Sequence, residues 1–259
     1  MAMLAAMLRT LRTGLVTFLA IAAAIASGAP AQAQTLRRMN VWDLQLGAPV
    51  GAQPPWEEFK GYGCGTNGGP IIKRITKFAE FAACAPDARG WYEVYFEYDD
   101  ELEFIARAMD NPMEIDRWAG TADGGHPVMV SALFDKDGIL KAIRILTDPR
   151  ADFVAQDARL VIHGRESAYQ YGAIIAPRFN LDSNRDCASL PLAEGETAVA
   201  GRSIKLRCQR LDPDRGRRVV LEVNYYRKPG QAGRDPGVPT RLTIGQFESS
   251  TRLEIYAIP

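Results

Sequence analysis

Acid–base chemistry in this chain would have to come from two histidines and one run of carboxylates. His126 lies in a Gly-Gly-His-Pro segment, and His163 lies further along the chain. The acidic run contains Glu97, Asp99, Asp100, Glu101 and Glu103. A general base must lie within hydrogen-bond reach of the group it deprotonates, and no spacing links either histidine to a nucleophile. The sequence therefore assigns no catalytic residue. A carboxylate-dependent hydrolase of envelope polymers, using Glu97, Asp99 or Asp100 with His126, remains an alternative.

Segments with several carboxylate side chains leave open the alternative of a small-ligand or calcium-binding protein. The acidic run offers the oxygens that calcium prefers, but it contains no glycine and does not follow the pattern of an EF-hand loop. Asp135-Lys136-Asp137-Gly138 begins like a calcium loop and then continues into Ile139-Leu140, which favours a plain turn. Gly65 to Pro70 lacks the Gly-Lys-Ser/Thr ending of a phosphate-binding loop. We therefore expect no cofactor and no metal.

Four cysteines form two pairs of similar spacing, Cys64 with Cys84 and Cys187 with Cys208. An even count in an oxidising compartment predicts disulfides, and four cysteines allow three connectivities. We favour the two local pairings because each closes a short loop, and each would contribute roughly 3 kcal/mol. Zinc is disfavoured, since the chain has no C-x-x-C spacing and no histidine near these cysteines.

The first 33 residues have the pattern of a cleaved signal peptide. Arg9 and Arg12 precede an apolar stretch from Leu15 to Ile25, and Ala31-Gln32-Ala33 places small residues at the positions that a signal peptidase reads. The apolar stretch is short of the roughly 20 residues that span a bilayer. We expect cleavage after Ala33, no transmembrane segment after cleavage, and a soluble periplasmic or secreted chain.

Charge argues against a nucleic-acid partner. The full chain has 31 basic and 31 acidic residues, and without Arg9 and Arg12 the 31 acidic residues face 29 basic ones. No basic stripe interleaved with aromatic residues is present.

Periodicity predicts an α+β fold in which antiparallel hairpins are packed by a few helices. Apolar residues recur at helical spacing over 71–84 and 155–171, whereas alternation or apolar runs predict strands over 91–98, 128–134, 139–147, 204–208, 219–226, 241–247 and 251–258. Each cysteine pair precedes a Glu-Val-led strand, at Glu93 and at Glu222, which suggests two similar halves. The expected units are 34–149 and 150–259, or one continuous domain.

Aromatic residues and carboxylates alternate along the strand that begins at Trp91. If one face of this strand is core, the other presents Trp91, Glu93, Tyr95 and Glu97, and exposed aromatic residues between carboxylates suit a protein or glycan contact. The alternative is that both faces are covered.

Leu46-Gly47-Ala48-Pro49-Val50, together with the hairpin around Asp135-Lys136-Asp137-Gly138, resembles small periplasmic modules of the BamE-like and beta-lactamase-inhibitor-protein-like folds. The resemblance implies helices packed on an antiparallel sheet and a role in binding other proteins. It carries over no functional residue. Taken together, the sequence predicts a non-catalytic binding or adaptor protein of the cell envelope, with a protein or glycan partner.

Overall fold

The structure, a computed structural model, describes residues 39–65, 67–98, 109, 121–124, 126–148, 165–231 and 247–258. The expected signal segment, His163 and the acidic residues from Asp99 to Glu103 lie outside the described residues, as do residues 155–164 of the second expected helix and residues 241–246 of one expected strand.

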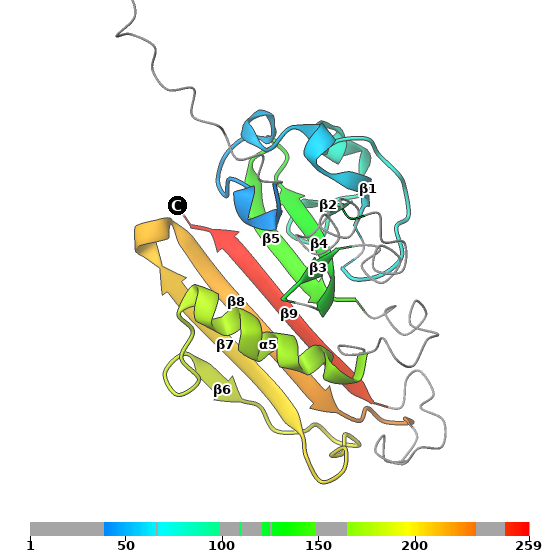
Figure 1. Cartoon of the computed structure of the whole chain (residues 1–259), viewed down its shortest axis with the longest axis vertical. Coiled ribbons are helices and arrows are strands. Elements are labelled where there is room, and N and C mark those ends of the chain that lie inside the picture. The colour runs from blue at the N-terminus through cyan, green and yellow to red at the C-terminus, as the bar shows by residue number, and fades with distance from the viewer. Residues whose placement is uncertain are drawn as a thin grey trace, which may run out of the picture. The chain divides into compact units, whose positions relative to one another are not determined.

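The described chain is dominated by one antiparallel sheet (Figure 1). Its strands are β1 (Lys60–Cys64), β2 (Tyr92–Glu97), β4 (His126–Phe134), β5 (Leu140–Thr147), β6 (Cys187–Ser189), β7 (Ile204–Asp212), β8 (Arg217–Tyr226) and β9 (Glu248–Ala257). They follow the order β1-β2-β4-β5-β9-β8-β7-β6, and the short β3 (Ala122–Asp123) pairs with β4 beside this path. The C-terminal strand β9 therefore lies inside the sheet, between β5 and β8.

The β4–β5 hairpin follows directly from its turn chemistry. Asp135 accepts hydrogen bonds from the backbone N–H groups of Asp137 and Ile139 at 3.0 and 2.9 Å. Gly138 supplies the positive φ of 76° that closes the turn, a conformation that glycine adopts without steric cost. The apolar segments on either side then pair as strands. The Leu46–Val50 segment docks on this hairpin, because Gly47 donates to the carbonyl of Leu140 and Val50 to that of Gly138.

Cross-strand register divides the side chains of the sheet into two faces. The first, called here the helix face, carries most of the apolar core, including Val94, Phe96, Val130, Phe134, Ile145, Leu221 and Leu253. Short 3₁₀ turns contribute Val41 and Phe78 to the same core; they are η1 (Val41–Asp43), η2 (Val50–Ala52), η3 (Trp56–Glu58) and η4 (Phe78–Ala83). A further turn, η7 (Pro213–Arg215), joins β7 to β8.

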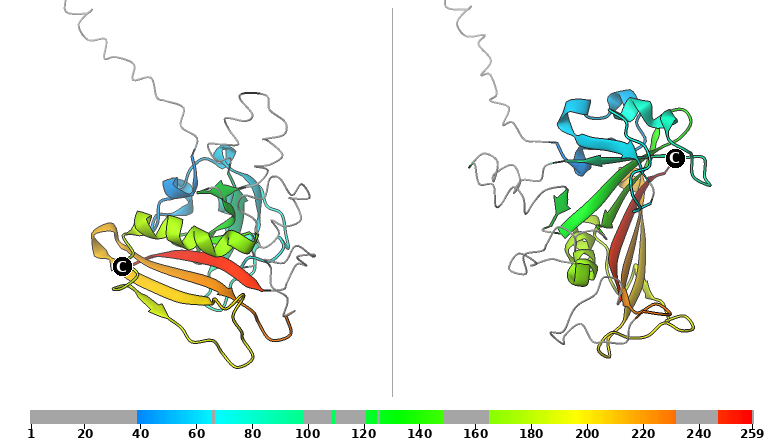
Figure 2. Two further views of the ribbon diagram at one scale, coloured as in Figure 1. Left: turned by 60° about the horizontal axis from the view of Figure 1, so that its bottom comes forward. Right: turned by 90° about the vertical axis from the view of Figure 1, so that its right-hand side faces the viewer.

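One helical segment lies across β8 and β9 on the helix face (Figures 1 and 2). It runs through η5 (Arg165–Gln170), α5 (Tyr171–Ile175) and η6 (Ala176–Phe179), and it ends at Asn180, whose φ of 51° is left-handed. Tyr171, Ile175 and Phe179 are buried at intervals of four residues, so one stripe of the segment faces the sheet.

The hydroxyl of Thr251 in β9 is inserted into this helical segment. It accepts from the backbone N–H of Gly172 at 3.1 Å and donates to the carbonyl of Ala168 at 2.8 Å. These are the two groups that an ordinary helical i to i−4 bond would join, and Thr251 is fully buried. The helix also comes close to the sheet here, because a Cβ on Gly172 would lie 2.4 Å from Val223.

The expected α+β class is wrong: the described chain is mainly β, with one short helical segment. The expected helix over 71–84 is reduced to η4. Its first half runs extended beside β1, with Cys64 donating to the carbonyl of Lys73 at 2.7 Å and Ile75 to that of Tyr62 at 3.1 Å. Ile75 in the extended part and Phe78 at the start of η4 are both buried, so their spacing reflects contacts with the core and not a continuous helix.

Both disulfides join the cysteines that the short loops favoured, Cys64 with Cys84 and Cys187 with Cys208. The first links β1 to the end of η4 and is buried at both cysteines. The second joins directly opposed residues of β6 and β7. Strands from both sides of the expected boundary at residue 149 pair with one another, since β5 pairs with β9.

Candidate interaction surface

The second face of the sheet, called here the charged face, carries a continuous row of side chains across six strands. In register order this row is Glu93, Leu133, Ala142, Tyr256, Arg218 and Leu211. The neighbouring row runs through Tyr95, Ser131, Arg144, Glu254, Val220 and Gln209. Charged and aromatic residues of β2, β5, β9 and β8 therefore lie side by side in these two neighbouring rows.

Arg144 is the buried centre of this face. Its Nη1 donates to Oε2 of Glu93 at 2.6 Å, and its Nε donates to Oε1 of Glu254 at 2.7 Å. Arg252 contacts the same Glu254 oxygen at 2.7 Å. Removing one partner from a buried pair of this kind costs roughly 3–5 kcal/mol, because the other charge is left uncompensated. The network therefore fixes β2, β5 and β9 relative to one another.

The glycine-rich segment after β1 covers the Glu93 end of the network. The backbone N–H of Asn67 donates to Oε2 of Glu93 at 3.2 Å. A Cβ on Gly65 would lie 2.4 Å from the Glu93 side chain, so only glycine allows this approach. Within the described residues, the buried Oε1 of Glu93 accepts no hydrogen bond.

The network sets the charge of Glu254. Burial alone would raise the pKa of its carboxyl, but hydrogen bonds from Tyr256 and Arg144 and the charges of Arg252 and Arg144 lower it to about 2. For Arg144, burial lowers the pKa, and the two glutamates outweigh this and raise it. Both residues are therefore ionised across the whole neutral range.

Two arginines and two aromatic rings stack beside this network, and we call Arg89, Trp91, Arg218 and Tyr256 the arginine–aromatic patch. The Arg89 guanidinium lies 4.3 Å from the Trp91 ring centre and 5.9 Å from that of Tyr256. Arg218 lies 4.5 Å from the Tyr256 ring centre. The two rings are 6.2 Å apart and tilted by 49°. Such guanidinium–aromatic contacts are worth about 0.5–1 kcal/mol each when exposed.

A tight turn before β2 holds Arg89 in place. The carboxylate of Asp87 accepts from the backbone N–H groups of Arg89 and Trp91 at 2.8 and 3.0 Å, and from Nε and Nη2 of Arg89 at 2.9 and 2.7 Å. Gly90 completes the turn with a φ of 77°. Burial acts to raise the pKa of Asp87, but these bonds and the charge of Arg89 lower it. The turn therefore presents Arg89 over Trp91 as a preformed pair.

The four residues that the sequence predicted on one interaction surface, Trp91, Glu93, Tyr95 and Glu97, differ in exposure in the structure. Glu93 is only 8% exposed and Tyr95 only 3%, whereas Trp91 and Glu97 are half-buried. Tyr95 donates its hydroxyl to Glu97 at 2.7 Å. Trp91 alone of the four belongs to the arginine–aromatic patch. Sequence reasoning missed Arg218 and Tyr256. Tyr256 contacts Trp91 and Arg218 contacts Tyr256, and both contacts depend on pairings of β9 with β5 and β8 that no local pattern indicates.

Among the described residues, the structure does not bring together the histidine and the carboxylate that the hydrolase alternative requires. His126 lies on the helix face with Val128 and Val130, whereas Glu97 lies on the charged face. His126 is buried with its ring 5.7 Å from Tyr171, and Tyr171 donates to Asp123 at 2.7 Å. Burial and the neighbouring Asp123 raise the pKa of this phenol well above its usual value. The sheet thus stands between His126 and Glu97.

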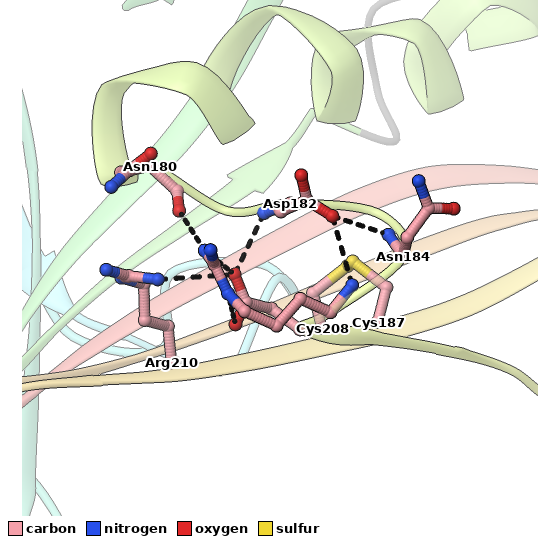
Figure 3. The surroundings of a disulfide bond; sticks show 8 residues. Asn180, Asp182, Asn184, Cys187, Cys208 and Arg210 are labelled. Carbon is pink, nitrogen blue, oxygen red and sulfur yellow. Dashed lines mark hydrogen bonds and ion pairs between the residues drawn. A yellow bond between two sulfur atoms is a disulfide. The ribbon is translucent and has the colours of Figure 1, made fainter.

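Asp182, Asn184 and Asp186 have the alternate spacing of calcium ligands, a signal that sequence reasoning did not use. Figure 3 shows that their segment is folded around the second disulfide. Asp182 accepts from the backbone N–H groups of Asn184 and Arg185, and Asp186 pairs with Arg185 at 2.8 Å and with Arg210 at 3.5 Å. The Arg185 bond and the backbone N–H of Asp182 hold the pKa of Asp186 well below its usual range. These oxygens therefore order the turn that leads into Cys187.

Comparisons with known proteins add no relative to this picture: no family model matches the chain, and neither a curated protein nor a solved structure matches it. Within the described residues, no helix is long and apolar enough to cross a membrane.

Proposed function

We propose that the chain is an exported, non-catalytic binding or adaptor protein of the cell envelope, and that it binds its partner on the charged face around the arginine–aromatic patch. The observation that carries this proposal is the stack of Arg89, Trp91, Tyr256 and Arg218 at the surface of a sheet whose other face is occupied by core. Tryptophan, tyrosine and arginine are the residue types that dominate the binding energy of protein interfaces.

The rigidity of the arginine–aromatic patch supports the same proposed binding role. The patch lies beside the Glu93–Arg144–Glu254 network, and Asp87 holds Arg89 by three hydrogen bonds and the backbone N–H of Trp91 by a fourth. Side chains that are already ordered lose little conformational entropy on association, which favours affinity. The two local disulfides, together with the export signal expected from the sequence, support the proposal of a periplasmic site of action.

Site-specific photo-crosslinking in living cells tests the proposal. A photoreactive amino acid replaces Gln209 or Leu211, which are exposed on the charged face, or Gln170, an exposed glutamine on the helical segment. We expect discrete adducts from positions 209 and 211 and none from position 170. Equal adducts from all three positions, or none from the charged face, would refute the proposal.

The contribution of the patch is tested in the same experiment with matched tryptophan variants. Trp91→Ala removes a patch residue, whereas Trp56→Ala removes a tryptophan that is 55% exposed and lies in η3. We expect Trp91→Ala to reduce the adduct yield at position 209 severalfold and Trp56→Ala to leave it unchanged. The reverse order of effects would place the binding surface elsewhere.

A further inference from the structure

The charges of the arginine–aromatic patch are not fully matched. Arg89 pairs with Asp87, Arg252 with Glu254, and Arg144 with Glu93. Among the described residues, no carboxylate forms an ion pair with Arg218, which contacts the ring of Tyr256 instead. The patch thus retains one guanidinium, that of Arg218 at its β8 end, without a carboxylate partner among the described residues.

The stacked position of Arg218 determines what it can bind. A guanidinium that lies on an aromatic ring through its face keeps its N–H donors free in its own plane, and that geometry fits a carboxylate bidentately. On the next strand, Arg207 is more than half exposed and lies 3.7 Å from Glu222, a distance that is long for a charge-assisted hydrogen bond. Arg218 therefore has no carboxylate partner among the described residues, and Arg207 on the neighbouring strand has only a long ion pair.

The neighbour of Arg218 on the other side is apolar. Leu211 lies directly opposite Arg218 in the β7–β8 register, and it is 59% exposed. An exposed leucine beside stacked arginine and aromatic residues, on a pleated sheet surface, suits a protein partner that supplies both acidic and apolar side chains. An acidic sugar chain would make use of the guanidinium N–H donors but not of Leu211.

From this arrangement we infer that the partner of the charged face is a protein surface on which acidic side chains, placed beside apolar ones, bind Arg218. The inference rests on the proposed function and specifies the chemistry of its partner. Attraction between such surfaces also accelerates association, and it weakens as salt is added.

Direct titration of the purified mature chain tests the chemistry with defined probes. The probes are a fluorescent peptide of alternating Glu and Leu, the corresponding Lys and Leu peptide, and an oligogalacturonate. We expect the Glu–Leu peptide to bind and the Lys–Leu peptide not to bind. Tighter binding of the oligogalacturonate than of the Glu–Leu peptide would show that the acidic partner of Arg218 is a glycan, and it would overturn the inference.

Matched arginine variants locate the binding. Arg218→Gln removes the guanidinium that has no carboxylate partner, whereas Arg202→Gln removes an exposed arginine that lies over the Tyr169 ring at 5.4 Å, outside the patch. Loss of a hydrogen bond to a charged group predicts roughly tenfold weaker binding for Arg218→Gln. We expect Arg202→Gln to stay within twofold of the unmodified chain. Equal effects of the two substitutions, or no binding of the Glu–Leu peptide, would overturn the inference.

The two proposals can fail separately. Adducts from the charged face without Glu–Leu binding would retain the binding role and reject an acidic partner. Glu–Leu binding that depends on Arg218, without adducts in cells, would establish the chemistry of the patch and reject the proposed envelope partner.

Discussion

At the scale of single residues, Arg144 and Glu254 define how the charged face is built. Two glutamates and an arginine are buried together, and the excess carboxylate is matched by Arg252. Buried ion pairs often add little net stability compared with apolar residues, but they strongly disfavour states in which one partner is lost. The network is therefore better understood as a device that fixes the relative position of three strands than as a source of stability.

Acid should remove the contribution of Glu254 in a defined pH range. Its pKa is about 2 in the folded chain, compared with about 4.3 in an unfolded chain. Stabilisation by the ionised carboxylate is thus complete above about pH 5 and is lost as the pH falls toward 2. Urea midpoints measured between pH 6 and pH 2.5 should fall less steeply for Glu254→Gln than for the unmodified chain.

The control for this prediction is Glu194→Gln, which changes an exposed glutamate outside the network. Its midpoints should follow those of the unmodified chain at every pH. Parallel curves for Glu254→Gln and the unmodified chain would contradict the assignment of a low pKa to Glu254.

At the scale of elements, the join between the helical segment and β9 depends on one hydroxyl group. Thr251→Val keeps the shape of the side chain but leaves the carbonyl of Ala168 and the N–H of Gly172 without their partner in a buried position. Each unsatisfied buried group costs about 1–3 kcal/mol, so we expect a loss of at least 2 kcal/mol in the free energy of unfolding. Chemical denaturation measures this loss, and hydrogen exchange at the Gly172 amide should accelerate.

Thr251→Ser is the matched control, since it keeps the hydroxyl and removes only a methyl group. It should cost about 1 kcal/mol, mainly through the small cavity that it leaves. A Thr251→Val variant that is as stable as Thr251→Ser would show that the hydroxyl is dispensable.

Local chemistry explains which elements could be predicted from the sequence. The strand around Tyr92–Glu97 and the β4–β5 hairpin follow from alternation and from the Asp135–Gly138 turn, which act within a few residues. The expected helix over 71–84 failed because Ile75 and Phe78 are buried through tertiary contacts with β1 and β2 rather than by helical periodicity. Arg218 and Tyr256 could not be linked to Trp91, because those contacts need the long-range pairings of β9 with β5 and β8.

At the scale of the whole molecule, the expected signal peptide predicts that the exported chain lacks residues 1–33. The small residues at Ala31 and Ala33 predict that an exported chain starts at Gln34. N-terminal sequencing and intact mass of the periplasmic product measure this directly. The same sample should contain no free thiol, since all four cysteines are paired.

Substitution of Ala33 by Arg should block cleavage and leave the uncleaved precursor. The conservative control Ala33→Ser should be processed normally, because serine is also small. Recovery of unmodified chains that still begin at Met1 would contradict the expected signal peptide.

The position of β9 has a consequence for when this chain can fold. β9 joins β5 to β8, so among the described strands the β1–β5 region and the β6–β8 region share no pairing until residues 248–257 have been synthesised. Pairings of such long sequence separation form slowly. A nascent chain that lacks residues 248–257 cannot join the two halves of this sheet, so the described fold is completed only after β9 has been made.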